Sequence, residues 1–281
     1  MLSHDLWLLP LGLFIGAFGT LIGAGGGFIL VPILLLLYPG EDTELITSTS
    51  LAVVFFNAAS GTWAYSRMKR VDYKSGIVFA IATIPGAILG AITTAYVPRH
   101  AFDIIFGALM ILAGIFLWFS ARDDHAHTHG NATDDPKSAT AAGLASRDLT
   151  DADGTRYHYS YNQALGIGIS LFVGYVSSVL GVGGGFIHVP ALNRLLNFPV
   201  HIATATSHFV LAIMALTGTL VHIWRGVFQQ GIARTAMIAL GVIVGAQVGA
   251  RLSNRVGGKW IIRALAIALL FVGIRLLLNE F

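Results

Sequence analysis

The chain carries the stretch GAGGGFILVP at residues 23–32 and a near copy of it, GVGGGFIHVP, at residues 181–190, identical at eight of ten positions. Other short stretches recur in the same order in the two halves. They are TSTS at 47–50 with TATS at 204–207, GT at 61–62 with GT at 218–219, and GAILGA at 86–91 with GAQVGA at 245–250. A fixed order of recurring motifs indicates an internal duplication.

The sequence is strongly apolar. Of its 281 residues, 55% are hydrophobic and 11% are charged, whereas a soluble domain carries roughly 25% charged residues. This composition excludes a soluble enzyme, a disordered chain and a nucleic-acid-binding protein, and it predicts an all-α polytopic membrane protein. The expected apolar runs are 6–38, 45–65, 77–96, 101–119, 163–196, 201–224, 232–250 and 260–278.

A polar stretch separates the two apolar halves. Residues 122–162 hold seven of the fourteen acidic residues, so we expect a solvated cytoplasmic linker between membrane repeats at 1–121 and 163–281. The linker residues His125, His127 and His129 alternate. Three imidazoles could gather a divalent metal, although nothing in the sequence indicates how they would be ordered.

The glycine-broken runs 6–38 and 163–196 allow two topologies. If each run crosses the membrane once, the halves are parallel; if each is a re-entrant helical hairpin followed by three transmembrane helices, the halves are inverted. Basic residues favour the cytoplasmic side. With the basic loop 67–74 placed inside, inverted repeats put nine basic residues inside and four outside, whereas parallel repeats give seven and six. We therefore favour inverted repeats with both termini outside.

Three consecutive glycines predict a helix break in each half, because an interior glycine costs about 1 kcal/mol relative to alanine. Broken backbone in a membrane needs protein or a watery cavity around it. The helix that follows then presents free N–H groups, which favour an anion. The alternative is that the glycines only permit a tight turn. The backbone candidates for an anion site are Gly25, Gly26, Gly27, Gly183, Gly184 and Gly185.

Hydroxyl residues begin the next helix in each half. Such side chains can donate to an anion, or they can bond to a carbonyl one helical turn back. No Asp or Glu lies deep in a predicted span, which favours an anionic over a cationic substrate. The hydroxyl candidates for the substrate site are Thr49, Ser50, Thr206 and Ser207.

Histidines give the second half a distinct chemistry. His188 and His208 replace Leu30 and Leu51 of the first half. We include His208 in the substrate site, and both histidines are candidates for proton coupling because imidazole titrates near neutral pH. The alternative is a neutral histidine hydrogen-bonded between helices, and this is the favoured interpretation of His222.

With G-x-G-G-G-F-I-x-V-P in both halves, A-T-x-T-S at 203–207 and the G-A-x-x-G-A stretches, the sequence resembles the sulfite exporter TauE/SafE family of membrane permeases. The resemblance covers the chain outside the linker. It implies a duplicated permease that moves a sulfur-containing anion, such as sulfite or an organosulfonate, across the cytoplasmic membrane. By position it implies the same glycine and hydroxyl residues as the substrate site.

We therefore predict a secondary transporter that works by alternating access in the cytoplasmic membrane. We expect no enzymatic activity, no cofactor, no metal site and no nucleic-acid partner; the expected partners are the small anion and the lipid bilayer, and a homodimer is left open. The alternatives are a divalent metal-ion transporter that uses the linker histidines, and a membrane sensor. Ser207 and His208 point about 100° apart on a helix, which argues against a catalytic pair.

Overall fold

The chain is mostly helical in a computed structural model that describes residues 6–120, 144–227, 231–253 and 258–280. The helical prediction is confirmed there. In chain order the elements are α1 Leu8–Ile22, α2 Gly27–Leu37, α3 Thr43–Arg67, α4 Tyr73–Thr94, α5 Arg99–Ser120, β1 Ala145–Thr150, β2 Arg156–Tyr161, α7 Gln163–Leu180, α8 Gly185–Arg194, α9 Val200–Trp224, α10 Ile232–Ser253 and α11 Gly258–Glu280.

Five of the described helices are long and apolar enough to cross a membrane. They are α3, α4, α7, α9 and α10. The helices α1, α2 and α8 have 15, 11 and 10 residues. At 1.5 Å per residue these three are shorter than the roughly 30 Å of a hydrocarbon core. The protein is thus a multi-pass membrane protein that also contains helices too short to span.

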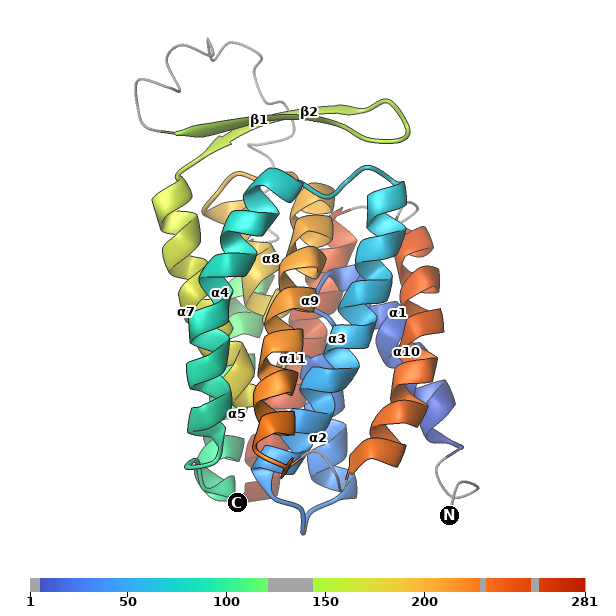
Figure 1. Cartoon of the computed structure of the whole chain (residues 1–281), viewed down its shortest axis with the longest axis vertical. Coiled ribbons are helices and arrows are strands. Elements are labelled where there is room, and N and C mark those ends of the chain that lie inside the picture. The colour runs from blue at the N-terminus through green and yellow to red at the C-terminus, as the bar shows by residue number, and fades with distance from the viewer. Residues whose placement is uncertain (1–5, 121–143, 228–230, 254–257, 281) are drawn as a thin grey trace.

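The helices α1 and α2 form a hairpin that enters and leaves at one end of the body. The helix α1 packs along α10 in the same direction. Tyr38, which follows α2, packs its ring under the guanidinium of Arg234, 3.6 Å away at the start of α10. Both outer ends of this helical hairpin therefore lie where α10 begins. The N- and C-termini lie at the same end of the body (Figure 1), which we call the termini end.

The helices α7 and α8 form a second hairpin that opens at the opposite end. The helix α7 packs along α4 in the same direction. The segment after α8 packs Phe198 against Phe79, near the start of α4, and against Tyr159 of β2. This end carries the two strands (Figure 1), and we call it the strand end.

Glycines allow the outer helix pairs to pack with their backbones in contact. A Cβ atom on Gly245 of α10 would lie 2.2 Å from the carbonyl oxygen of Leu13 in α1. A Cβ atom on Gly86 of α4 would lie 2.3 Å from the carbonyl oxygen of Leu171 in α7. Small residues are what permit such an approach between membrane helices. The helices α3 and α9 pack on each other and also on α10 and α4, which places them between the outer pairs.

Two antiparallel strands lie within the expected linker 122–162, where we expected none from the sequence. They pair Ala145 with Tyr161 and Thr150 with Arg156. Tyr159 and Tyr161 are 5% and 1% exposed and pack on Phe198. Tyrosines at alternate positions share one face of a strand, and this signal is lost when composition is averaged over the whole linker. His125, His127 and His129 lie outside the described residues.

Buried ion pairs fix these strands to the helices. The Arg70 guanidinium, after α3, lies 3.3 Å from the Asp151 carboxylate in the turn between the strands. Burial alone would raise the pKa of Asp151, but hydrogen bonds from the Thr155 N–H and from Arg70 outweigh it and hold the pKa below the usual 3.8. Its stabilisation is therefore complete above pH 3.8 and is lost as pH falls through the lower folded-state pKa.

A second polar cluster lies at the start of α4. Asp72 caps this helix by accepting from the Ser75 N–H and hydroxyl. The Tyr159 hydroxyl also donates to the Asp72 carboxylate, at 2.9 Å, and the Arg147 guanidinium lies 3.6 Å from it. The strands thus contribute both an aromatic and a charged partner to the strand end of α4.

The close helix packing predicts that Gly245→Ala lowers the melting temperature of the detergent-purified protein. The added methyl group must push α1 and α10 apart, at a cost of about 1 to 3 kcal/mol. Gly168→Ala in α7 is the control, since no atom lies within 4 Å of a Cβ there. It should leave the melting temperature unchanged or raise it. Equal losses in both variants would contradict the packing described.

The Arg70–Asp151 ion pair predicts faster hydrogen exchange of residues 145–161 at pH 7 in the Asp151→Asn variant, because a buried guanidinium loses its buried charged partner. Asp148→Asn provides a matched change in the same strands, since the Asp148 side chain is 82% exposed. It should exchange like the unaltered protein. If Asp151→Asn also leaves exchange unchanged, the ion pair does not fix the strands.

Candidate functional site

The two glycine turns touch each other in the middle of the molecule. A Cβ atom on Gly27 would lie 2.5 Å from the carbonyl oxygen of Val182, and one on Gly185 would lie 2.2 Å from that of Gly23. Each turn therefore packs against the backbone of the other, at a distance that no side chain could occupy. The structure thus brings all six predicted glycines, three from each half, into one place.

Left-handed backbone lets each turn start a new helix. Gly26 has φ 78° and Gly184 has φ 65°, and these residues precede α2 and α8. Only glycine adopts such angles at little cost. The first N–H groups of a helix have no acceptor within that helix and carry a partial positive charge. Two short helices therefore direct their positive ends toward the same central region.

Two apolar side chains cover the turns. A Cβ atom on Gly25 would meet Leu211 at 2.7 Å, and one on Gly183 would meet Val54 at 2.5 Å. Val54 lies in α3 and Leu211 lies in α9, at corresponding positions of the two halves. Both are buried. The central region is therefore packed closed in this structure, with α3 and α9 as its covers.

Several hydrogen-bonding groups close to the turns are buried without a partner. The Ser50 hydroxyl donates to the Gly181 carbonyl at 2.6 Å, whereas that of Ser207, its counterpart, has no partner. Buried polar atoms in native proteins nearly always have a partner, so side chains of this kind are candidates to bind a polar ligand. Among those on α3, α7 and α9 are Thr49 Oγ1, Asn57 Nδ2, Thr62 Oγ1, Ser177 Oγ, Ser178 Oγ, Thr204 Oγ1, Ser207 Oγ and His208 Nε2.

His208 belongs to a polar group beside the first turn. Its Nδ1 lies 3.2 Å from the Thr204 carbonyl oxygen, and its Nε2 would lie 3.0 Å from a Cβ on Gly61. Thr20, next to Gly61, donates to Asn57 Oδ1 at 3.0 Å. In the part of the chain that the structure describes, Nε2 of His208 has no hydrogen-bond partner. His208 lies one helical turn after Thr204, the α9 residue that packs on Gly23.

Three predicted site residues lie away from the turns. Thr49 lies next to Gly231, before α10, and Thr206 accepts from the Asp72 N–H at 3.0 Å, before α4. Adjacent helix positions differ by about 100°, so these residues and their neighbours Ser50 and Ser207 face different helices. His188 Nε2 lies 3.3 Å from the Ser170 hydroxyl. The hydroxyl candidates that remain at the turns are Ser50 and Ser207.

Sequence reasoning missed the residues that precede each glycine turn. Thr20 and Ser178 each lie three positions before the glycine that ends the first helix of their half. Both are buried. A hydroxyl at the same place in the two repeats was the signal that could have identified them.

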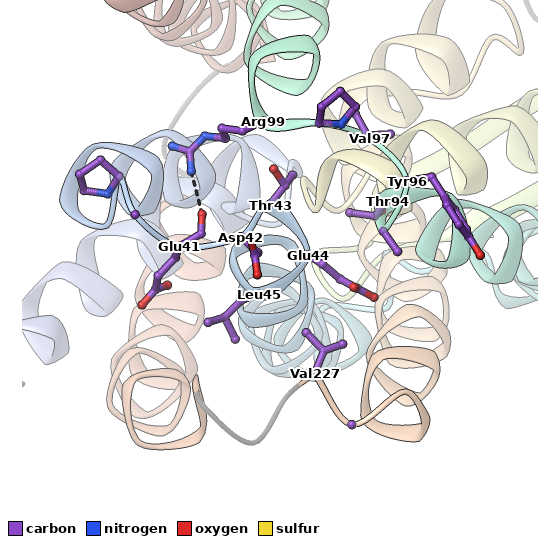
Figure 2. A pocket seen from close by; sticks show the side chains of 15 residues that line it. Glu41, Asp42, Thr43, Glu44, Leu45, Thr94, Tyr96, Val97, Arg99 and Val227 are labelled. Atoms are coloured by element: carbon purple, nitrogen blue, oxygen red, sulfur yellow. Dashed lines mark hydrogen bonds between the residues drawn. The ribbon is translucent and has the colours of Figure 1, made fainter.

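A pocket of about 1050 Å³ opens at the termini end, far along α3 from the turns. It is formed by the loops α2–α3, α4–α5 and α9–α10, and it carries Glu41, Asp42, Glu44 and Arg99 (Figure 2). Glu41 and Glu44 lie beside the guanidinium groups of Arg234 and Arg225, so arginines balance these two carboxylates of the opening.

Apolar helices around two glycine-broken hairpins, with partnerless polar groups between them, define a multi-pass membrane transporter. The family model for sulfite exporter TauE/SafE matches residues 8–276. The chain belongs to this family.

The curated relatives are transporters by name. A probable membrane transporter protein of Bacillus subtilis, YunE, is 33% identical over 276 residues and covers 96% of each chain. A probable membrane transporter protein of Methanocaldococcus jannaschii is 22% identical over 270 residues, 90% of each chain. The Bacillus subtilis protein YdhB, also named a probable membrane transporter, is 23% identical over 237 residues, 83% of this chain and 84% of its own. No solved structure matches this chain.

The contact between the two halves predicts that Ser50→Ala destabilises the protein by about 1 to 3 kcal/mol, because the buried Gly181 carbonyl loses a donor. Ser48→Ala, two positions away, removes only a hydroxyl that bonds to the Leu45 carbonyl of its own helix. We expect it to change the free energy of unfolding little. Thermal unfolding in one detergent measures both, and equal effects would contradict the assigned role of Ser50.

Proposed function

We propose that this protein is a secondary transporter that carries a small sulfur-containing anion, such as sulfite or an organosulfonate, across the cytoplasmic membrane. The supporting observation is the convergence of two helix N-termini and several partnerless donors at the glycine turns. The acidic residues of the described chain lie at or near helix ends, in loops or in the strands. An anion therefore meets donors and partial positive charge at the turns.

The proposed topology is two inverted repeats, each with a re-entrant hairpin. The support is a two-fold pattern in the helix pairing: α1 pairs with α10 as α7 pairs with α4, while α3 with α9 and α5 with α11 pair across the halves. Exchange of the two halves leaves these pairs unchanged. The excess of basic residues then assigns the strand end to the cytoplasm and the termini end to the outside.

The two apolar side chains that cover the glycine turns support an alternating-access mechanism. Val54 and Leu211 close the central region from α3 and α9, so movement of either helix relative to the hairpins uncovers one side of the anion. The inverted arrangement makes the two movements equivalent. Ser207 and His208 would donate to the anion from α9, and Ser50 would help to hold the second turn in place.

Uptake into proteoliposomes tests the anion site. In Ser207→Ala, the loss of a donor to a charged ligand should weaken apparent affinity for ³⁵S-sulfite by roughly 10- to 100-fold. Thr217→Ala on the same helix is the control, since its hydroxyl bonds to the Ile213 carbonyl. Equal uptake by both variants would remove Ser207 from the site.

The substrate class is tested by thermal shift of the purified protein with sulfite, thiosulfate, sulfoacetate, sulfate and nickel chloride. A ligand that binds the folded state raises its melting temperature by mass action. We expect stabilisation by at least one sulfur oxyanion and none by nickel. Stabilisation by nickel alone, abolished by deletion of residues 125–129, would favour the metal-transport alternative instead.

A further inference from the structure

A buried histidine lies beside Glu44, one of the residues that line the pocket at the termini end. His222 of α9 is 0% exposed, and its Nδ1 lies 3.5 Å from Oε1 of Glu44, in the first turn of α3. Among the described residues, neither ring nitrogen of His222 has a hydrogen-bond partner. Glu44 lines the pocket (Figure 2). A carboxylate that can meet solvent thus lies next to an imidazole that cannot.

We propose that His222 and Glu44 form a proton-binding site that exchanges protons with the outer solution through this pocket. The proton would reside on Nδ1 of His222 and face Glu44. This inference rests on the proposed transport function for its biological role, but the site itself is defined by the pocket and by these two side chains.

The residue that corresponds to His222 in the first half makes a hydrogen bond between two helices. Tyr65 occupies in α3 the place that His222 occupies in α9. The Tyr65 hydroxyl donates to the Thr20 carbonyl at 2.8 Å and ties α3 to α1. His222 makes no such bond to a helix. A fixed interhelical contact in one half is therefore replaced in the other by a titratable ring beside a carboxylate.

The charges around His222 come from three segments. Arg225, one turn further along α9, lies 3.2 Å from Glu44 Oε1 and also donates to the Ile92 carbonyl of α4. Asp42 lies before α3 and adds a second negative charge to the pocket. Arg234 of α10 is engaged by Glu41. The end of α4, residues 91–95, brings no charged side chain. Glu44 can therefore balance Arg225 alone or share its charge with a protonated His222.

A short route connects this site to the glycine turns. Gly218 lies one helical turn before His222, and a Cβ atom there would lie 2.9 Å from the Ser178 hydroxyl. Ser178 precedes the second glycine turn and has no hydrogen-bond partner. The proposed proton site thus lies within two side chains of the proposed anion region.

Direct observation of the imidazole tests the site without any transport assay. We would record ¹⁵N-histidine spectra of the purified full chain between pH 4 and 9 and assign His222 from the His222→Gln variant. Its signal should titrate, and Glu44→Gln should move the midpoint toward acid by about one pH unit or more, since an opposite charge within about 4 to 6 Å favours the imidazolium. The His188 signal, which has no carboxylate beside it, serves as the control and should not move.

Proteoliposomes test the coupling. A pH gradient, acid outside, should raise ³⁵S-sulfite uptake severalfold in the unaltered protein. His222→Gln should lose this stimulation and keep sulfite exchange at equal pH, whereas His100→Gln, an exposed histidine at the same end, should keep both.

Three results separate the two ideas. A His222 signal that does not titrate, or that ignores Glu44→Gln, overturns the proton site. Full stimulation in His222→Gln overturns its role in coupling. If the unaltered protein moves no sulfur anion at all, the proposed function fails while a Glu44-dependent titration would still establish the proton site.

Discussion

The contact between the two glycine turns is the constraint on which the rest of the structure depends. Gly27 lies against the Val182 carbonyl and Gly185 against the Gly23 carbonyl, so each half supplies the surface on which the other packs. Neither turn could be buried alone, because its backbone would remain exposed to lipid. The close pairing of α1 with α10 and of α7 with α4 then holds the two hairpins in position around this contact.

Much of the fold could be predicted from sequence because the responsible signals are strong. Long apolar runs predicted the helices, and the repeated glycines predicted a break at residues 23–27 and 181–185, where the structure ends one helix and begins another. The strands 145–150 and 156–161 were missed, since their alternating tyrosines occupy a short part of a polar stretch. The burial of those tyrosines depends on Phe198, which is distant in sequence.

The candidate site was predictable in its backbone but less so in its side chains. The six positions are glycine because left-handed backbone angles or close backbone contacts leave no room for a side chain there. Thr49 and Thr206 face other helices than their neighbours Ser50 and Ser207 do, and proximity in sequence does not tell which face of a helix meets a turn. Similarly, His222 gave no sign of its environment, since Glu44 reaches it from another helix.

The two halves have the same order of helices, but their polar side chains differ. Partnerless donors from α9, including Ser207 and His208, lie toward the first turn, whereas the corresponding residues of α3 are Ser50, which is bonded to Gly181, and Leu51. An acidic pocket opens at the termini end, next to a histidine that replaces a bonded tyrosine. The proposed anion site and the proposed proton site therefore depend on side chains that differ between the two halves.

A crystal structure with selenite, a sulfite analogue whose selenium gives an anomalous signal, tests the proposed substrate site most directly. We predict a peak between the N-termini of α2 and α8, within hydrogen-bond distance of the Ser207 hydroxyl, with Val54 or Leu211 displaced. A peak confined to another region, or none at concentrations that stabilise the protein, would contradict the claim that the glycine turns form the substrate site.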